Sequence, residues 1–426
     1  MNSNKIKQNI QYTIAALLLF AMLPIMSCSD KDTKPTTQNR PGYYGKHFGS
    51  PFEQFIITLK ALHEDKRNAA VLEYQLVHPH TPVIESDSIV SVYYFGNADA
   101  VILNSDLHLG WTAPDTLDAI ACNGQTFFHR TFTLPADARI DYTLTIGNIT
   151  SPDPGNPVIT PGGYGSHSEI SMPGFHPDPA RTYREDVAHG IVDSIWLVSK
   201  DTAVVSRMAR VYLPANYDTL SRLPVLYIMD GIEAMEFMQY TTVLDNLLAK
   251  GLIEPLLVVF MPPAQRHSEY IGSGQPVFMH ALCNEFVSVI DRMYKTDPQP
   301  SKRAIAGISS GGHMALVTLF SRPDVFLLGA DQSPTISHEV YESLRKLAEK
   351  TTPLPAFRIW MDAGNFDLVN GAMDGKTFLE SAKDFHHEME NRQIVHAFHI
   401  YNDGHQWASW RERTDDVLVY LFGRRE

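Results

Sequence analysis

The chain has 426 residues, of which 44% are hydrophobic and 19% charged, a composition that excludes wholesale disorder and fibrous structure. Its 48 acidic side chains outnumber its 35 basic ones, which gives a net charge of -13 and excludes the basic surface that non-specific nucleic-acid binding needs. Its three cysteines are too few for a disulfide-stapled scaffold and have no zinc-binding spacing.

The first residues have the pattern of an export signal. A short basic region precedes an apolar run at 14–23, which is too short for a membrane span of about 20 residues. The run ends in Ile25-Met26-Ser27-Cys28, which resembles a bacterial lipobox, and the following residues, 29–32, are similar to the acidic export tag of surface lipoproteins. We therefore expect a signal peptide over 1–27, lipid on Cys28, and a place in the outer membrane, at the cell surface or on its periplasmic face. A plain secretory signal is the alternative.

The next segments predict a tether and a small β domain. Residues 28–49 are polar and typical of a flexible tether. Over 50–150 we expect a helix and then an Ig-like β-sandwich that begins near residue 70. Ser50-Pro51-Phe52-Glu53 would open the helix, with Ser as N-cap and Glu completing a capping box. Short strands with turn signals between them are expected at 89–95, 100–103, 127–134 and 140–146.

The remainder divides into a connector and a larger domain. Residues 151–187 are rich in proline and glycine and predict an ordered connector. From 188 to 426 strands and helices alternate, which indicates one α/β domain with a mostly parallel sheet. We expect strands at 208–213, 224–229, 256–261, 303–308, 326–330, 358–362 and 395–401, and helices at 240–250, 277–294, 310–320, 377–391 and 407–421.

A candidate nucleophile lies between one of these strands and the next helix. Gly307-Ile308-Ser309-Ser310-Gly311 matches G-x-S-x-G, and its position after a strand and before a helix is the context that a nucleophile elbow requires. At a helix N-terminus, free N–H groups and the helix dipole favour developing negative charge. We therefore expect Ser309 to be a nucleophile.

A serine nucleophile needs a base, and in this fold class the chain order is Ser, acid, His. His405 follows the last expected strand and precedes the last helix, so it is the expected base. Four other histidines lie inside expected helices or strands and are interpreted as surface or packing residues: His386, His387, His396 and His399.

The acid should follow the strand at 358–362. Asp367 lies in the loop after this strand and is favoured, because it has the freedom to reach an imidazole; Asp362 and Asp374 are the alternatives. The acid would hold the histidine tautomer and stabilise the imidazolium.

An oxyanion hole needs two backbone N–H groups. One is expected from Ser310, directly after the nucleophile, and the other from Gly231 or Ile232, in the turn after the strand at 224–229. A simple turn at Asp230-Gly231 is the alternative.

The region from about 186 to 424 resembles the esterase D / enterochelin esterase-like group of α/β-hydrolases. The resemblance rests on ordered stretches at 186–190, 211–214, 226–231, 303–312, 331–333 and 404–407, with Trp410. It implies an α/β-hydrolase fold and a serine carboxylesterase that needs no metal or organic cofactor, with the triad on Ser309, Asp367 and His405. One departure is Asp403, which stands where members often have the first glycine of Gly-Gly.

The front domain resembles the Ig-like, carbohydrate-module-48-type domain that precedes many such esterases. The similar stretches are Gly110-Trp111, 135–142, Asn156-Pro157 and 168–174. The expected partners are a small-molecule or glycan-linked ester, the membrane through the lipid anchor, and no nucleic acid. Surface display and this front domain favour the glycan-linked ester.

The substrate is left open between two classes. Residues 265–270 resemble the Arg-x-x-Glu stretch of the siderophore group, so Arg266 and Glu269 could contact a catecholate siderophore; a structural ion pair between them is the alternative. Trp407 and Trp410 suit stacking on an aromatic ring or a sugar. A feruloyl or acetyl esterase acting on plant polysaccharide is the second enzyme hypothesis, and a non-catalytic surface lipoprotein that binds the ligand is the third.

Overall fold

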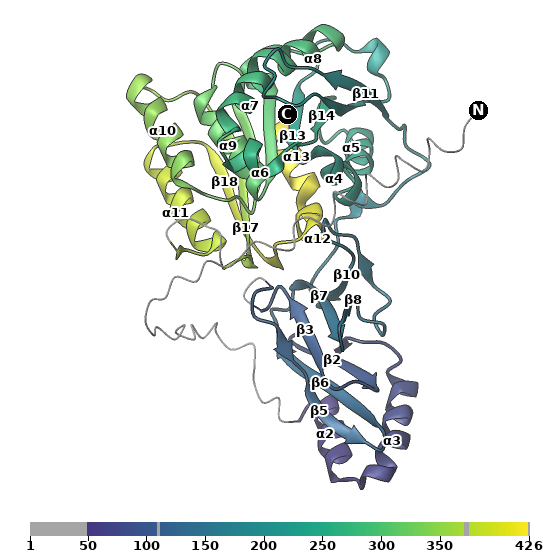
Figure 1. Cartoon of the computed structure of the whole chain (residues 1–426). Helices are drawn as coiled ribbons and strands as arrows, with labels where there is room; N and C mark the ends of the chain where they lie inside the picture. Colours follow the sequence, from purple (N-terminus) through teal and green to yellow (C-terminus); the bar gives the residue numbers. More distant parts are fainter. Residues whose placement is uncertain (1–48, 109–110, 370–374, 425–426) are drawn as a thin grey trace, which may run out of the picture. The chain divides into compact units, whose positions relative to one another are not determined.

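The computed structural model describes residues 49–108, 111–369 and 375–424 (Figure 1). These residues belong to one compact unit that runs from residue 43 to 426. The expected signal peptide, the lipidation site at Cys28, nearly all of the tether and Asp374 lie outside the described residues. Within the described ranges, no helix is both long enough and apolar enough to cross a membrane.

In the described residues, two helices precede the first strand. In α2 (Pro51–Ala61) the Ser50 hydroxyl caps the helix by accepting from the Glu53 N–H. The Glu53 carboxylate accepts from the Gly49 N–H and not from that of Ser50, so the expected capping box is only half formed. The second helix, α3 (Glu64–Val77), extends past residue 70, where strands were expected. It was missed because its apolar residues form no continuous stripe; Val71 alone is fully buried.

The β-sandwich has two antiparallel sheets. The first has the order β1-β2-β6-β5, and the second β4-β3-β7-β10-β9 with β8 paired to β7. Phe128 and Phe132 from the first sheet and Ile140 and Leu144 from the second fill the core between them. The strands are β1 (Val83–Ile84), β2 (Ile89–Gly96), β3 (Val101–Ser105), β4 (Asp115–Thr116), β5 (Asp118–Cys122), β6 (Gln125–Thr133), β7 (Arg139–Ile146), β8 (Ile149–Ser151), β9 (Ile159–Thr160) and β10 (His167–Ser171).

The sandwich continues into the stretch that was expected to be a connector. Strand β10 pairs with β7 over Ser168–Ser171 and Arg139–Tyr142, and with β9 on its other side. These strands were missed because they are short and lie among prolines and glycines. The stretch 151–187 therefore supplies part of the second sheet before it leads into the larger domain.

The larger domain is built on an eight-stranded sheet with the order β11-β12-β14-β13-β15-β16-β17-β18. The pairs β11–β12 and β12–β14 are antiparallel and all others are parallel, as the alternating pattern predicted. The strands are β11 (Ile191–Leu197), β12 (Arg207–Leu213), β13 (Val225–Met229), β14 (Leu257–Met261), β15 (Arg303–Ile308), β16 (Leu328–Gln332), β17 (Arg358–Phe366) and β18 (His396–Gly404).

Helices cover both faces of this sheet, because alternate residues of each buried strand point to opposite sides. In β13, Tyr227 packs with one group of helices and Ile228 with the other. The first group is α6 (Arg266–Ile271), α7 (Gln275–Ala281), α8 (Val287–Met293), α9 (Ser310–Ser321), α10 (His338–Lys350) and α11 (Phe378–Asn391), with a π-helical turn at Leu282–Phe286 between α7 and α8. The second group is α4 (Gly231–Phe237), α5 (Tyr240–Ala249), α12 (Trp407–Trp410) and α13 (Thr414–Phe422).

Three of the expected segments differ in ways that bear on the site. Strands β17 and β18 extend to Phe366 and Gly404, beyond the expected ends, and the side chains of Asn365 and Asn402 are hydrogen-bonded at 2.7 Å where the two strands end. The single helix expected over 407–421 is divided into α12, a 3₁₀ turn at Arg411–Arg413, and α13.

Candidate active site

Ser309 lies in a strained turn between β15 and α9. Its φ and ψ angles are 53° and −122°, a backbone conformation that side-chain-bearing residues rarely adopt. The turn needs glycine at 307, because a Cβ there would lie 2.2 Å from the carbonyl carbon of Gly311. The Ser309 N–H donates to the Gln332 carbonyl at 3.0 Å, which fixes the turn against the end of β16.

The structure brings His405 and Asp367 together. His405 Nδ1 lies 2.6 Å from Asp367 Oδ1, and the Asp367 side chain is 1% exposed. Because a carboxylate accepts, this bond places the ring proton of a neutral His405 on Nδ1 and leaves Nε2 as the basic nitrogen. Within the described chain, Nε2 makes no hydrogen bond to Ser309. The ring is held edge-on between Phe378 and Trp410, with both centroid distances 4.9 Å.

Asp367 is held in its ionised form by its surroundings. Burial alone would raise the pKa of this carboxyl, but the charge and hydrogen bond of His405, the Ser333 side chain and the Leu368 N–H together lower the pKa below its ordinary value. The Leu368 N–H donates to Oδ1 at 2.7 Å. The alternative acid, Asp362, instead accepts from Trp360 Nε1 at 2.8 Å.

Ser333 is a site residue that the expected triad did not include. Besides its contact with Asp367, its hydroxyl accepts from Trp410 Nε1 at 3.0 Å, so it joins the acid to the aromatic wall of His405. Ser333 follows β16 with a φ of 46°. Its position directly after a buried strand, at the edge where the parallel strands end, is the signal that could have identified it.

The two tryptophans differ from the expectation of a shared stacking surface. Trp410 is 4% exposed and packs against His405, so it supports the imidazole and offers no face to a ligand. Trp407 is partly buried, with its ring 5.5 Å from that of Trp410 and 5.7 Å from that of Phe237. A Cβ on Gly163 would lie 2.9 Å from Trp407 Nε1, so a sandwich loop borders this ring.

The expected oxyanion donors lie at the starts of two neighbouring helices. Strands β13 and β15 are adjacent and parallel, so the turns that follow them meet at one edge of the sheet. Gly231 and Ile232 open α4, and Ser310 opens α9. The first N–H groups of a helix have no partner within it, which leaves these donors available. Gly231 admits no side chain, because a Cβ there would lie 2.2 Å from the Met261 nitrogen.

Arg266 and Glu269 do not pair with each other. Arg266 donates from Nε and Nη2 to the two oxygens of Asp230, both at 2.8 Å, and so fixes the residue before Gly231. Glu269 is 6% exposed and accepts from the Arg207 guanidinium at 2.7 and 2.8 Å. Glu269 is therefore a buried structural residue, and its expected place in substrate binding is wrong. The Arg266 side chain remains 42% exposed.

Asp403, which stands where similar esterases often have glycine, is paired with a buried arginine. Its buried carboxylate accepts from the Arg413 guanidinium, which also lies 2.9 Å from Asp362 and 4.4 Å from the centre of the Tyr401 ring. Burial raises the pKa of Asp403 to about 6, although Arg413 opposes the shift. With glycine at position 403, the buried Arg413 guanidinium would keep Asp362 but lose its contact with the Asp403 carboxylate.

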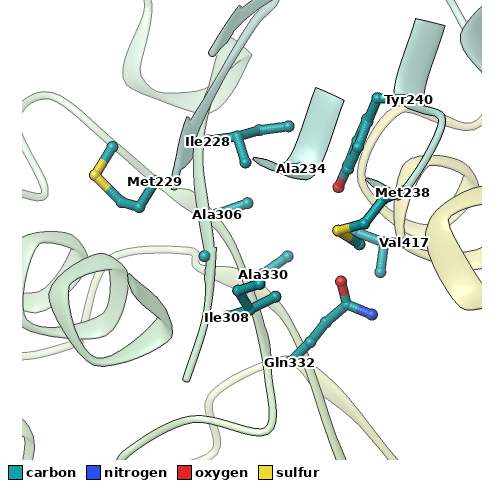
Figure 2. A pocket seen from close by; sticks show the side chains of 11 residues that line it. Ile228, Met229, Ala234, Met238, Tyr240, Ala306, Ile308, Ala330, Gln332 and Val417 are labelled. Carbon is teal, nitrogen blue, oxygen red and sulfur yellow. The ribbon is translucent and has the colours of Figure 1, made fainter. Parts of the chain in front are cut away.

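Two hollow spaces in the described part of the chain lie near the site, and Ser309 lines neither of them. A cavity of about 10 Å³ lies behind β15, where Ile228, Ala306 and Gln332 converge, and it is too small for a substrate (Figure 2). A surface groove of about 670 Å³ lies beside β12 and α4 and includes Ile232 and Pro262. Ile232 is the one expected site residue that lines it.

Comparison with known proteins places the chain in a family. The esterase family matches residues 205–420. Over 201 residues the chain is 30% identical to the endo-1,4-beta-xylanase/feruloyl esterase of Xylanibacter ruminicola, a match that covers 43% of this chain and 27% of that protein. The chain thus spans little more than a quarter of the length of this relative.

Two solved structures share the fold over most of the chain. The ferric enterobactin esterase of Salmonella typhimurium has a TM-score of 0.66 at 16% identity, and the alignment covers 82% of this chain and 98% of that one. The enterobactin esterase of Shigella flexneri has a TM-score of 0.63 at 17% identity, with the same coverage. These similarities confirm the expected α/β-hydrolase fold. The family match covers half of the chain, including Ser309, Asp367 and His405, and the chain therefore belongs to this esterase family.

Proposed function

We propose that the protein is a serine carboxylesterase in which Ser309, His405 and Asp367 form the catalytic triad. The observation that carries this proposal is the 2.6 Å contact between His405 and buried Asp367, in the same fold that holds Ser309 in a strained strand-to-helix turn. The contact leaves His405 Nε2 basic, and it is the nitrogen that can accept a proton from the serine.

The reaction follows from this arrangement in two half-reactions. Ser309 Oγ attacks the ester carbonyl carbon while His405 Nε2 takes its proton, and the resulting oxyanion is held by the Ser310 N–H and by that of Gly231 or Ile232. Collapse breaks the bond to the alcohol oxygen, which receives the proton from His405. Water, activated by the same nitrogen, then releases the acid and restores Ser309.

For the substrate we propose an ester that carries a phenolic ring, of the catecholate siderophore type. The half-exposed guanidinium of Arg266 can face an anionic or phenolic oxygen, and the partly buried Trp407 offers aromatic surface. The fold shared with enterobactin esterases supports this class. The alternative, a feruloyl ester on plant polysaccharide, is supported by the 30% identity to a xylanase/feruloyl esterase.

The activity is tested by replacing the nucleophile. We expect Ser309→Ala to lower kcat on p-nitrophenyl acetate by at least 10³-fold, and Ser321→Ala, at the exposed end of the same helix, to leave it unchanged. A fluorophosphonate should label the unmodified protein and not Ser309→Ala. An unlabelled, inactive protein would instead support the non-catalytic binding lipoprotein.

The substrate is tested by direct comparison. Hydrolysis of ferric enterobactin should be faster than that of methyl ferulate, and Arg266→Ala should raise KM for the anionic ferric complex more than for the neutral methyl ester. The opposite preference would favour the feruloyl esterase and would leave the proposed triad untouched.

A further inference from the structure

Three side chains at the C-terminal end of α11 converge on one small volume. His386 Nε2 lies 3.5 Å from Glu390 Oε1, and His387 Nδ1 lies 3.1 Å from Glu390 Oε2. The three groups can bring one nitrogen or oxygen each to within 4.8 Å of one another. Their spacing of three and four residues places both histidines beside Glu390 on the helix surface. We refer to His386, His387 and Glu390 as the α11 triad.

Two hydrogen bonds fix which ring nitrogen of His386 carries the proton. His396, at the start of β18, lies with Nδ1 2.8 Å from the Ile394 carbonyl, which can only accept, so Nδ1 carries the proton. In the neutral ring, Nε2 of His396 is then an acceptor. It lies 2.7 Å from His386 Nδ1, which must therefore donate to it. His386 Nε2 is left with a lone pair.

This lone pair faces a carboxylate. His386 Nε2 and Glu390 Oε1 are both acceptors in this state and lie 3.5 Å apart, so one cation between them could bind to both.

His387 can present a second lone pair to the same point. Its ring is exposed, so water can accept a proton from Nε2, which frees Nδ1. Two imidazole nitrogens and a carboxylate suit a borderline divalent cation such as Zn²⁺ and do not suit Mg²⁺ or Ca²⁺, which prefer oxygen ligands.

We propose that the α11 triad binds one divalent transition-metal ion of the Zn²⁺ type, with His386 Nε2, His387 Nδ1 and the Glu390 carboxylate as its protein ligands. His396 fixes the tautomer and orientation of His386 from outside, as a second-shell partner commonly does. The Phe398 ring, 4.8 Å from that of His386, holds the other side of the imidazole.

The site is separate from ester hydrolysis. His396 begins β18 and His405 follows its far end, so the two positions are roughly 30 Å apart along the strand, at about 3.3 Å per residue. A bound ion would instead stabilise the C-terminal end of α11.

The test is calorimetric titration of ZnCl₂ into the full chain, without a polyhistidine tag and after treatment with EDTA. We expect one site with micromolar or tighter affinity, weakened at least tenfold by His387→Ala and by Glu390→Gln. Both residues are exposed, so these variants should fold normally. His280→Ala, at an exposed histidine on α7, is the matched control and should bind as the unmodified protein does.

Two further readouts make the outcome decisive. Excess Zn²⁺ should raise the Tm of the unmodified protein and not that of Glu390→Gln. Esterase activity should be equal with and without the ion, so that failure here is distinguishable from failure of the proposed function. Equal affinity in all variants, or binding only at millimolar Zn²⁺, would overturn the proposal.

Discussion

At the scale of single residues, Asp367 shows how a buried carboxylate stays ionised next to the imidazole that it orients. Its oxygens are satisfied by donors from the imidazole, a serine and a backbone N–H, so the ionised form is retained although its side chain is only 1% exposed. The sequence predicted Asp367 from its loop position. The contacts of Asp362 with Trp360 and Arg413 came only from the structure, because no local pattern records a side-chain bond within a strand and Arg413 is distant in sequence.

We expect Asp367→Asn to lower kcat by about 10³- to 10⁴-fold with little change in KM, because an amide nitrogen facing His405 Nδ1 would favour the wrong tautomer. Steady-state kinetics on a p-nitrophenyl ester measure this. Asp87→Asn, at an exposed loop position, is the control. A loss under tenfold would indicate that another carboxylate orients His405.

The same carboxyl predicts a pH dependence of stability. Its pKa is lower in the folded than in the unfolded chain, so its contribution to the free energy of unfolding is present above the ordinary pKa of about 4 and is lost as pH falls further. Denaturant unfolding between pH 3 and 7 should show a smaller loss of stability on acidification for Asp367→Asn than for the unmodified protein. Equal slopes for the two proteins would contradict this expectation.

Glu269 gives a contrasting prediction. Replacing it with alanine leaves the buried Arg207 guanidinium without its carboxylate, so we expect Glu269→Ala to lower the free energy of unfolding by about 3 kcal/mol. Urea denaturation measures the loss. The KM of the fraction that remains folded should be unchanged, whereas a specific rise in KM at full stability would return Glu269 to the substrate site.

At the scale of elements, strands buried on both faces were the most predictable. Strand β15 matches its expected range of 303–308, because a run of apolar residues with both faces covered leaves little ambiguity. Strand β11 was missed: it is the edge strand, and six of its seven residues are exposed or partly exposed. Its place comes from pairing with β12, a tertiary interaction that no local pattern records.

A buried acid links two elements of the sandwich. Asp153 accepts from the Tyr142 hydroxyl of β7 at 2.7 Å, and its N–H donates to the Ser168 hydroxyl of β10 at 2.9 Å. Burial raises the pKa of Asp153 to about 6. The folded state therefore binds a proton that the unfolded chain has already released, and this group costs stability increasingly as pH rises from about 4 to 6.

We expect Asp153→Asn to remove that cost. As pH rises from 4 to 7, the free energy of unfolding of Asp153→Asn should increase relative to that of the unmodified protein. Denaturant titrations at several pH values measure it, with Asp87→Asn as control. A difference that is constant with pH would mean that Asp153 stays ionised in the folded sandwich.

At the scale of the whole molecule, the sequence predicted both domain types but not how they are joined. We propose, from the lipobox-like sequence alone, that Cys28 carries a lipid. Labelled palmitate should be incorporated by the unmodified protein in a bacterial host and not by Cys28→Ser, which should also leave the membrane fraction. Incorporation by Cys28→Ser would contradict the proposal, and retention of both proteins in the membrane would point to another attachment.

The segment that carries His405 is also the place where the sandwich meets the larger domain. Asn402 donates to Asp137 at 2.7 Å, Arg139 donates to Ser409 at 3.3 Å, and a Cβ on Gly404 would lie 2.0 Å from the Asp106 carboxyl carbon. The larger domain should therefore not be produced alone. A shortened protein that begins at residue 188 would expose the buried polar surface that Asn402, Gly404 and Ser409 form next to His405. We therefore expect the β-sandwich and the larger domain to be inherited together. Engineered variants of this protein should keep both domains.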